Sequence, residues 1–236
     1  MAVRISSELR LYVGAFDLGT ATTSSAVTLE ATPLDKTAFG DAAESSIPGL
    51  RKDAIEWAGW FDDGTGTGGG INQLLGTLLG SSGAAYSLYI GTTNGDRAYC
   101  GTIFVASVKP AGNVAELVKV VAMFKPDGTI EAGKHFGPRK VVSTSGTTDD
   151  SAATTSGGAF YSHVFGWVGT PTTGTMVLQH STDGTIWADV GTHNYQGPSG
   201  SSQRTTFSGT LRRYVRLTTS AAGSNNGAAA YVRTKD

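Results

Sequence analysis

The chain has 236 residues, of which 39% are apolar, only 16% are charged and 33 are glycine, so it is long enough for one large β domain or two of ordinary size. The 9% aromatic content argues against wholesale disorder, and the scarcity of Glu, Lys and Gln argues against a helical protein. The net charge of −1 disfavours a protein that wraps nucleic acid tightly, although residues 1–138 carry −4 and residues 139–236 carry +3.

Alternating apolar and polar residues predict antiparallel strands through the first half of the chain. The turn Asn94-Gly95-Asp96 between two of these runs is a strong hairpin signal. Residues 71–79, INQLLGTLL, have apolar side chains at helical spacing and predict one short helix. The predicted strands of this half cover residues 9–16, 26–31, 54–61, 86–92, 98–108, 116–124 and 129–133.

A long segment, residues 33–53, interrupts this pattern and is predicted to be a loop. Loops of that length are unusual inside a compact domain and are often functional. This one still contains Phe39, Ile47, Pro48 and Leu50, which predicts that it packs against something. We therefore take these four residues as candidates for a contact between subunits or between rings of subunits.

A second break divides the chain. Residues 143–158, STSGTTDDSAATTSGG, have no large apolar side chain and are predicted to be a linker. Six short strands follow, which is the content of a small β-sandwich. The sequence thus predicts an all-β protein with an antiparallel β-sandwich or barrel at 1–142 and a second, outward-facing β-sandwich at 159–236. The predicted strands after the break cover residues 159–168, 175–180, 185–190, 205–208, 212–218 and 228–232.

No motif gives a positive reason to propose an enzyme, a cofactor or a metal site. The glycine-rich run 64–70 contains a formal GxGxxG, but the chain returns to hairpins where a dinucleotide-binding fold needs parallel strands and helices. The four histidines show no metal-site spacing, and no GxSxG elbow occurs. Cys100 lies in an apolar run and is predicted to be a small buried side chain.

The sequence also predicts where the protein is made. The N-terminus lacks the apolar stretch of a secretory signal, and no window is apolar enough to span a membrane. We therefore expect synthesis in a cytoplasm.

The predicted second sandwich contains a candidate ligand contact. An Asp183-Gly184 turn precedes Trp187, and alternation around Arg212 places arginines on one side of a strand. These segments are similar to β-sandwich modules of discoidin type, some of which bind sugars. Trp187 and Arg212 are therefore candidates for contact with a glycan, although the favoured interpretation is that Trp187, Tyr214 and Val215 fill a sandwich core while the arginines are solvated.

Residues 9–135 resemble the major tail tube protein of long-tailed, siphovirus-like bacteriophages. The resemblance includes Leu11-Tyr12-Val13, Thr37-Ala38-Phe39-Gly40-Asp41, Ile47-Pro48-Gly49-Leu50 and Ile55-Glu56-Trp57-Ala58-Gly59-Trp60-Phe61-Asp62, followed by one short helix and antiparallel strands. Many such proteins carry an additional β-sandwich after the tube domain, and residues 160–233 are similar to those.

The resemblance implies a structural protein of the virion tail that assembles in the host cytoplasm. Six copies would form a ring, and stacked rings would form a tube for DNA ejection. The implied partners are further copies, tape measure and tail tip or terminator proteins, and phage DNA passing without specific binding; host glycans are a further candidate. An acidic or neutral lumen would let DNA slide, and the candidate lumen residues are Asp17, Glu30, Glu56 and Glu116.

Two other classes of protein are also consistent with the sequence. One is a carbohydrate-binding surface module built around Trp187, and the other is a capsid or tail decoration protein that forms no tubes. Under the tail tube interpretation, the second sandwich is expected to fold alone, and its removal is expected to expose little apolar surface.

Overall fold

The computed structural model describes residues 8–19, 21–38, 43–61, 71–113, 116–137, 140–141, 147–150, 155–165, 173–195, 201–221 and 226–233. Within these residues nearly all regular structure is β-strand, and every pairing between named strands is antiparallel. The predicted all-β class with one short helix is confirmed. The glycine-rich run at 64–70 lies outside the described residues.

The first half follows the predicted order of elements closely. The predicted hairpin across Asn94-Gly95-Asp96 is present, with Ala84 opposite Ile103 and Tyr89 opposite Ala98. The elements of this half are β1 (Leu9–Val13), β2 (Phe16–Asp17), β3 (Thr22–Thr28), β4 (Ala31–Asp35), β5 (Ser46–Arg51), β6 (Ala54–Trp60), α1 (Ile71–Leu78), β7 (Ala84–Ile90), β8 (Arg97–Ala111), β9 (Lys119–Pro126) and β10 (Glu131–His135).

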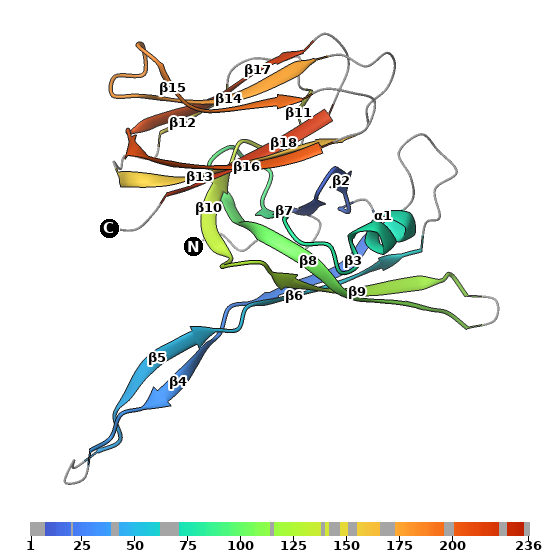
Figure 1. The fold of residues 1–236 in the computed structure, drawn as a ribbon. Coiled ribbons are helices and arrows are strands. Elements are labelled where there is room, and N and C mark those ends of the chain that lie inside the picture. The colour runs from blue at the N-terminus through green and yellow to red at the C-terminus, as the bar shows by residue number, and fades with distance from the viewer. Residues whose placement is uncertain are drawn as a thin grey trace.

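The long strand β8 connects two parts of the structure. Its first part lies between β7 and β10, and its second part pairs with β9 from Ile103 to Ala111. Strand β9 then pairs with β6, and β6 with β3. We call these four strands, β3, β6, β9 and the second part of β8, the open sheet (Figure 1).

One face of the open sheet packs on a hydrophobic core that is formed by side chains of the first half. Ile55 and Trp57 of β6 are buried there with Phe124 of β9 and Leu75 of α1, while Glu56 on the opposite face is exposed. This is the alternation that the sequence predicts for residues 54–61. The ring nitrogen of Trp57 donates a hydrogen bond to the Thr22 hydroxyl at 2.7 Å, which satisfies its one polar group.

The described residues of the second half form two facing layers of antiparallel strands. An outer sheet, β12-β17-β14-β15, faces a middle layer, β16-β13-β18 (Figure 1). Phe160 of the middle layer packs between the sheets with Met176, Leu178 and Val215 of the outer sheet. The strands of this half are β11 (Lys140–Val141), β12 (Thr147–Asp150), β13 (Thr155–Phe165), β14 (Gly174–Ser181), β15 (Ala188–Tyr195), β16 (Ser201–Leu211), β17 (Tyr214–Ala221) and β18 (Asn226–Arg233).

Part of the predicted linker is strand. Thr147–Asp150 forms β12 at the edge of the outer sheet, opposite Tyr214–Leu217, and β13 begins at Thr155. An edge strand needs main-chain pairing on one side only, so a segment without large apolar residues can form one. The lack of large apolar residues at 143–158 therefore does not exclude strands, and the prediction of a linker is wrong for 147–150 and from 155 onward.

The two halves share a sheet and a layer of buried side chains. Strand β10 pairs with β18, with Lys134 opposite Tyr231, and Gly133 lies so close to the Tyr231 carbonyl that a Cβ there would collide with it. A buried cluster combines first-half and second-half residues: Tyr12, Tyr89, Ala98, Cys100, Ala159, Tyr161, Ala228, Ala230 and Val232. Cys100 is buried, as predicted, and burial raises the pKa of its thiol to about 12.

This shared layer bears on the domain organisation. The division at 143–158 stays a prediction, because a sandwich core can be distinct and still be attached to its neighbour. The expectation that removal of the second half exposes little apolar surface is wrong, since Tyr12 and Tyr89 are fully buried against that half. The sequence pattern does not show that β13 and β18 have two buried faces.

A buried histidine connects the halves through hydrogen bonds. His163 of β13 donates from Nδ1 to the Gly14 carbonyl at 2.9 Å, and its Nε2 lies 2.8 Å from the Ser87 hydroxyl. Both ring nitrogens are thus used by a neutral imidazole, with Ser87 donating to Nε2. Burial lowers the pKa of His163 to about 4, and burial together with His163 lowers the pKa of His193 to about 4.

We expect the fold to lose stability as the pH falls from about 6.5 to about 4. In this window the unfolded chain binds protons at these histidines and the folded chain does not, so protonation favours unfolding. The shift at His163 corresponds to about 3 kcal/mol at the acid end of the window. Urea unfolding at a series of pH values measures it.

The matched variant for this test is His163→Gln, which keeps a donor and an acceptor but does not titrate. The pH slope of its free energy of unfolding should be smaller than that of the unsubstituted chain by the amount that corresponds to about one bound proton. The part of the slope that comes from His193 should remain. Equal slopes for the two proteins would contradict the assignment.

Candidate assembly interface

The predicted loop at 33–53 is instead a two-stranded arm. Strands β4 and β5 pair with each other, with Leu34 opposite Ile47 and Asp35 opposite Ser46, and they join no other strand in the described part of the chain. The arm projects away from the body of the molecule (Figure 1). Its apolar residues alternate over only a few positions around two prolines, so the sequence pattern is too short to distinguish a ribbon from a loop.

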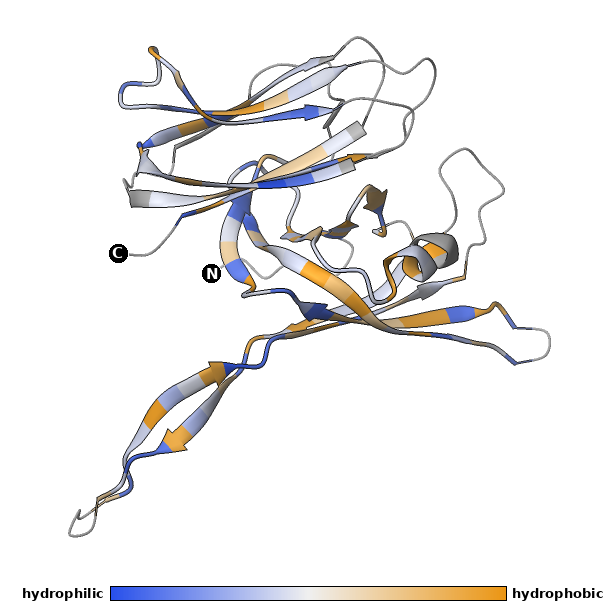
Figure 2. Cartoon of the chain, viewed as in Figure 1, coloured by the Kyte–Doolittle hydropathy of each residue, from blue (hydrophilic) through white to orange (hydrophobic). Residues whose placement is uncertain are grey.

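Both faces of the arm expose apolar side chains. Leu34 and Ile47 are directly opposite and therefore share one face. Pro33 and Pro48 are also opposite one another, on the other face, where Leu50 is 85% exposed. Figure 2 shows hydrophobic residues along both strands. An isolated two-stranded ribbon is marginally stable in water, so a partner is expected to cover this one.

Three of the four predicted interface residues therefore lie together on the arm. Ile47, Pro48 and Leu50 are exposed in β5. Phe39 lies outside the described residues. Leu34 was not among the predicted interface residues, and its place in the arm follows from its pairing with Ile47.

The root of the arm is fixed to the body by a buried carboxylate. Arg51 forms an ion pair with Asp53 at 2.6 Å and donates from Nη2 to the Ile130 carbonyl at 2.9 Å. Asp53 is buried and also accepts a hydrogen bond from the Ile130 amide at 3.2 Å. These bonds join the β5–β6 connection to the segment before β10, and so they restrain the angle of the arm.

The open sheet has two edges without strand partners among the described residues. Strand β3 pairs only with β6, and β8 beyond Val105 pairs only with β9. Backbone groups on such edges are available to another strand. Because the edges lie at opposite sides of one sheet, the β3 edge of one copy can pair with the β8 edge of the next.

The face of the open sheet that turns away from the core is mixed in charge. Alternation with the buried residues places Glu56 of β6 on this face, together with Lys119 and Lys125 of β9 and Lys109 of β8. Trp60 is also on this face, and the Lys119 ammonium lies 5.4 Å from the centre of its ring. Three lysines and one glutamate therefore lie on this face, and Glu56 is the only one of the four lumen candidates among them.

The four lumen candidates are not brought together. Glu56 lies in the open sheet and Asp17 lies in β2. Glu30 lies at the root of the arm, where its carbonyl accepts a hydrogen bond from Lys52, and Glu116 lies in the turn before β9, bonded to Asn113. Whether any of them faces a lumen stays a prediction.

A second exposed apolar cluster lies at the far end of the open sheet from the arm. Strand β6 ends at Trp60 and Phe61 follows it, while Leu117 and Val118 precede β9. The Phe61 amide donates a hydrogen bond to the Val118 carbonyl at 2.8 Å. All four side chains are exposed. We call these residues the apolar rim; the arm lies at one end of the sheet and the β8–β9 turn at the other (Figure 1).

Trp187 and Arg212 do not contact one another through any interaction that the described residues show. Arg216, two residues after Tyr214, lies over the Trp187 ring at 4.2 Å. The Arg212 side chain is exposed, and its main-chain amide donates to His180 Nδ1 at 3.3 Å. The arginine on the Trp187 ring is thus Arg216 and not the predicted Arg212.

The described residues contain no group of three His, Cys, Asp or Glu side chains that could hold a metal ion. No helix in the described ranges has the length and apolar content needed to cross a membrane.

No family model and no curated protein matches the sequence. Solved structures do resemble part of the chain. One is a protein in the virion of a native gene transfer agent particle, at 13% identity and a TM-score of 0.44, covering 54% of this chain and 97% of that one. Another is the SPP1 tail tube, at 11% identity and a TM-score of 0.44, covering 54% and 78%. A third is the tail of an empty gene transfer agent particle with C6 symmetry, at 13% identity and a TM-score of 0.43, covering 55% and 98%.

Proposed function

We propose that the chain is a structural virion protein whose copies join into rings and whose rings stack into a tail tube. The observation that carries the proposal is the arm, an ordered ribbon with apolar side chains on both faces and no cover from its own chain among the described residues. A ribbon of this kind needs a second molecule to bury it. The resemblance seen in residues 9–135 supplies the number of copies in a ring, six.

Within a ring, the open sheet of each copy pairs with the next through β3 and β8. Both edges offer a stretch of similar length, seven residues in β3 and the residues after Val105 in β8. Edge pairing would convert six open sheets into one closed barrel, which removes every free edge. The face with Glu56 and the three lysines would then line the bore.

Between rings, the arm of one copy docks on the apolar rim of a copy in the next ring. The two clusters lie at opposite ends of the open sheet, so a head-to-tail contact buries both at once. The tube would be the conduit for DNA during ejection, in contact with tape measure and tail tip or terminator proteins. Lysines on the lining would make the contact with DNA non-specific and sensitive to salt.

Electron microscopy of the purified protein tests this proposal. At high protein concentration we expect rings or tubes with sixfold symmetry in negative stain, and fast-sedimenting species in the ultracentrifuge. A monomer that persists at high concentration, even when mixed with tail tip proteins, would overturn the proposal and favour a decoration protein or a monomeric surface module.

A further inference from the structure

Arg216 is held in a fixed position on the outer face of the outer sheet. Its guanidinium carbon lies 4.2 Å from the centre of the Trp187 ring, and its Nε donates to the Gln179 side-chain oxygen at 2.7 Å. Gln179 is itself oriented by Asp189, which accepts its amide hydrogen at 2.6 Å. A stacked and hydrogen-bonded guanidinium loses little side-chain freedom when it binds a ligand.

The Trp187 ring owes its position to a rigid loop. Asp183 accepts hydrogen bonds from the main-chain amides of Thr185 at 2.8 Å and Ile186 at 3.0 Å, and from the Ser181 hydroxyl at 2.8 Å. These hydrogen bonds hold the pKa of Asp183 well below its usual range, and the bond from the Ile186 amide has the largest effect. The carboxylate is thus occupied within its own loop.

The terminal nitrogens of Arg216 have no partner in the described part of the chain. Arg233 of the same half differs, because its Nη1 and Nη2 donate to the carbonyls of Leu211 and Arg212 at 3.1 and 3.0 Å. Arg233 is therefore part of the fold, whereas Arg216 presents its two amino groups to solvent at a half-buried position. Two parallel N–H groups match the two oxygens of a carboxylate or a phosphate.

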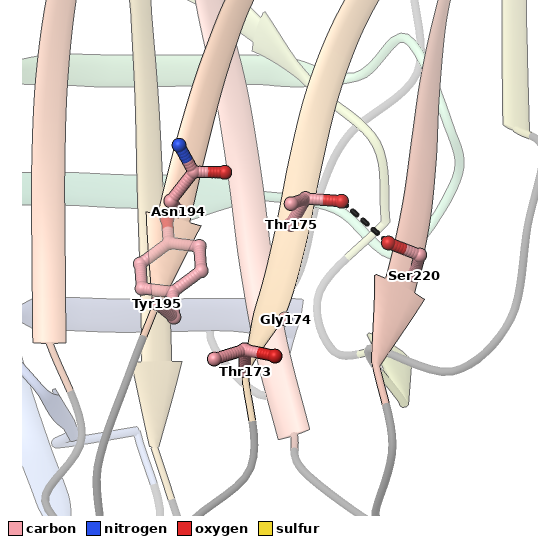
Figure 3. Close-up of a pocket in the computed structure, with 6 residues that line it drawn as sticks. All are labelled: Thr173, Gly174, Thr175, Asn194, Tyr195 and Ser220. Atoms are coloured by element: carbon pink, nitrogen blue, oxygen red, sulfur yellow. Dashed lines mark hydrogen bonds between the residues drawn. The ribbon is translucent and has the colours of Figure 1, made fainter.

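Small polar side chains continue from Arg216 along the same face. Thr218 and Ser220 follow on β17 at two-residue spacing, so Ser220 lies about 13 Å from Arg216 along the strand. Ser220 lines a hollow of about 370 Å³ with Thr173, Gly174, Thr175, Asn194 and Tyr195 (Figure 3). The hydroxyls of Thr175 and Ser220 are 2.5 Å apart, and Asn194 adds an amide.

We propose that this face binds an acidic oligosaccharide, with the oxyanion of one sugar on the Arg216 amino groups and the hydroxyls of another in the hollow of Figure 3. The separation of the two sites is that of two or three sugar rings. Hydroxyl and amide side chains match sugar hydroxyls, and Arg216 selects a sugar that carries a uronate carboxylate or a phosphate. Asp189 beside Gln179 disfavours a long polyanion such as nucleic acid, which needs a row of cations.

Titration calorimetry with three trisaccharides tests the proposal: an α-1,4-linked trigalacturonate, the neutral galactotriose of the same linkage, and a trisaccharide bearing one sugar phosphate. We expect the acidic ligands to bind at least about tenfold more tightly than the neutral one. Comparison of the carboxylate-bearing ligand with the phosphate-bearing ligand distinguishes the two kinds of oxyanion. Equal binding of acidic and neutral ligands, or no binding of any, would overturn the proposal.

Matched arginine variants locate the site. Arg216→Lys keeps the charge but loses the paired amino groups and should weaken binding about tenfold or more. Arg204→Lys is the control. The Arg204 guanidinium also lies over an aromatic ring, 5.6 Å from the centre of Tyr161, and its Nε donates a hydrogen bond to the Tyr161 hydroxyl. Arg204 belongs to the middle layer, however, and not to the proposed binding face. Equal losses in the two variants would contradict the site.

A further variant keeps the test valid if Arg216→Lys fails to fold. Ser220 is exposed, so Ser220→Leu should fill the hollow, leave the fold intact and weaken the acidic trisaccharides severalfold. Unchanged affinity in this variant would place the ligand elsewhere. The test uses no assembly step, so its outcome is independent of whether the chain forms tubes.

Discussion

Replacing Ile47, Pro48 and Leu50 together by serine should abolish assembly and leave the monomer folded. The three residues are exposed on the arm and belong to none of the three buried clusters, so the fold does not depend on them. Their burial on a neighbouring copy would contribute on the order of 3–6 kcal/mol per interface. Negative-stain images and sedimentation velocity measure assembly, and circular dichroism measures folding.

The control for this variant is Ile186→Ser. Ile186 is 77% exposed, in the loop before Trp187, and so tests whether loss of any exposed apolar side chain prevents assembly. We expect this control to assemble normally. Normal tubes from the triple variant, or its global unfolding, would show that the arm does not carry the contact.

A chain that ends at residue 142 should be insoluble or fail to fold. Truncation there removes β18, the strand partner of β10, and takes away the second-half side of the buried cluster that contains Tyr12, Tyr89 and Cys100. Each buried aromatic side chain is worth about 1.5–3 kcal/mol, which is a large share of the stability of a domain. Expression followed by size-exclusion chromatography measures the result.

Co-expression of residues 143–236 as a separate chain is the control for the truncation. If the shared layer is the cause, the second chain should restore solubility and elute together with the first. A truncated chain that is soluble, unfolds cooperatively and forms tubes of unchanged bore would contradict the shared layer and support an independent outer domain.

Much of the fold was predictable because it depends on local pattern. The alternation of 54–61, the Asn94-Gly95-Asp96 turn and the helical spacing after residue 71 each specify one element, and the structure has all three. The shared layer was not predictable in the same way. Strands β13 and β18 bury both faces and consist largely of small residues such as Ala228, Ala229 and Ala230, so no polar alternation marks them.

The sequence indicates which residues are candidates for a contact, but not which residues of the chain lie beside them. The apolar residues at 47–50 predict a contact surface, which stays a prediction, and the cross-strand neighbour Leu34 follows only from the register of the arm. The sequence predicts Trp187 as a ligand contact, which stays a prediction, and the contact of its ring with Arg216 depends on the pairing of β14 with β17. The expectation of an acidic or neutral lumen came from the sum of charges in the first half, and that sum does not determine which face of a strand each residue occupies.

The position of the arm and the apolar rim at opposite ends of one sheet has a consequence for growth. A contact between two unlike surfaces that stacks one copy on the next along an axis does not return to its starting point, so it can repeat without limit. Any column of copies built this way has polarity: one end presents free arms, and the other presents free rims. Its two ends would add new copies at different rates, and nothing in the contact itself sets a final number of layers. The length of such a column would therefore have to be set by another molecule that measures it or blocks one end.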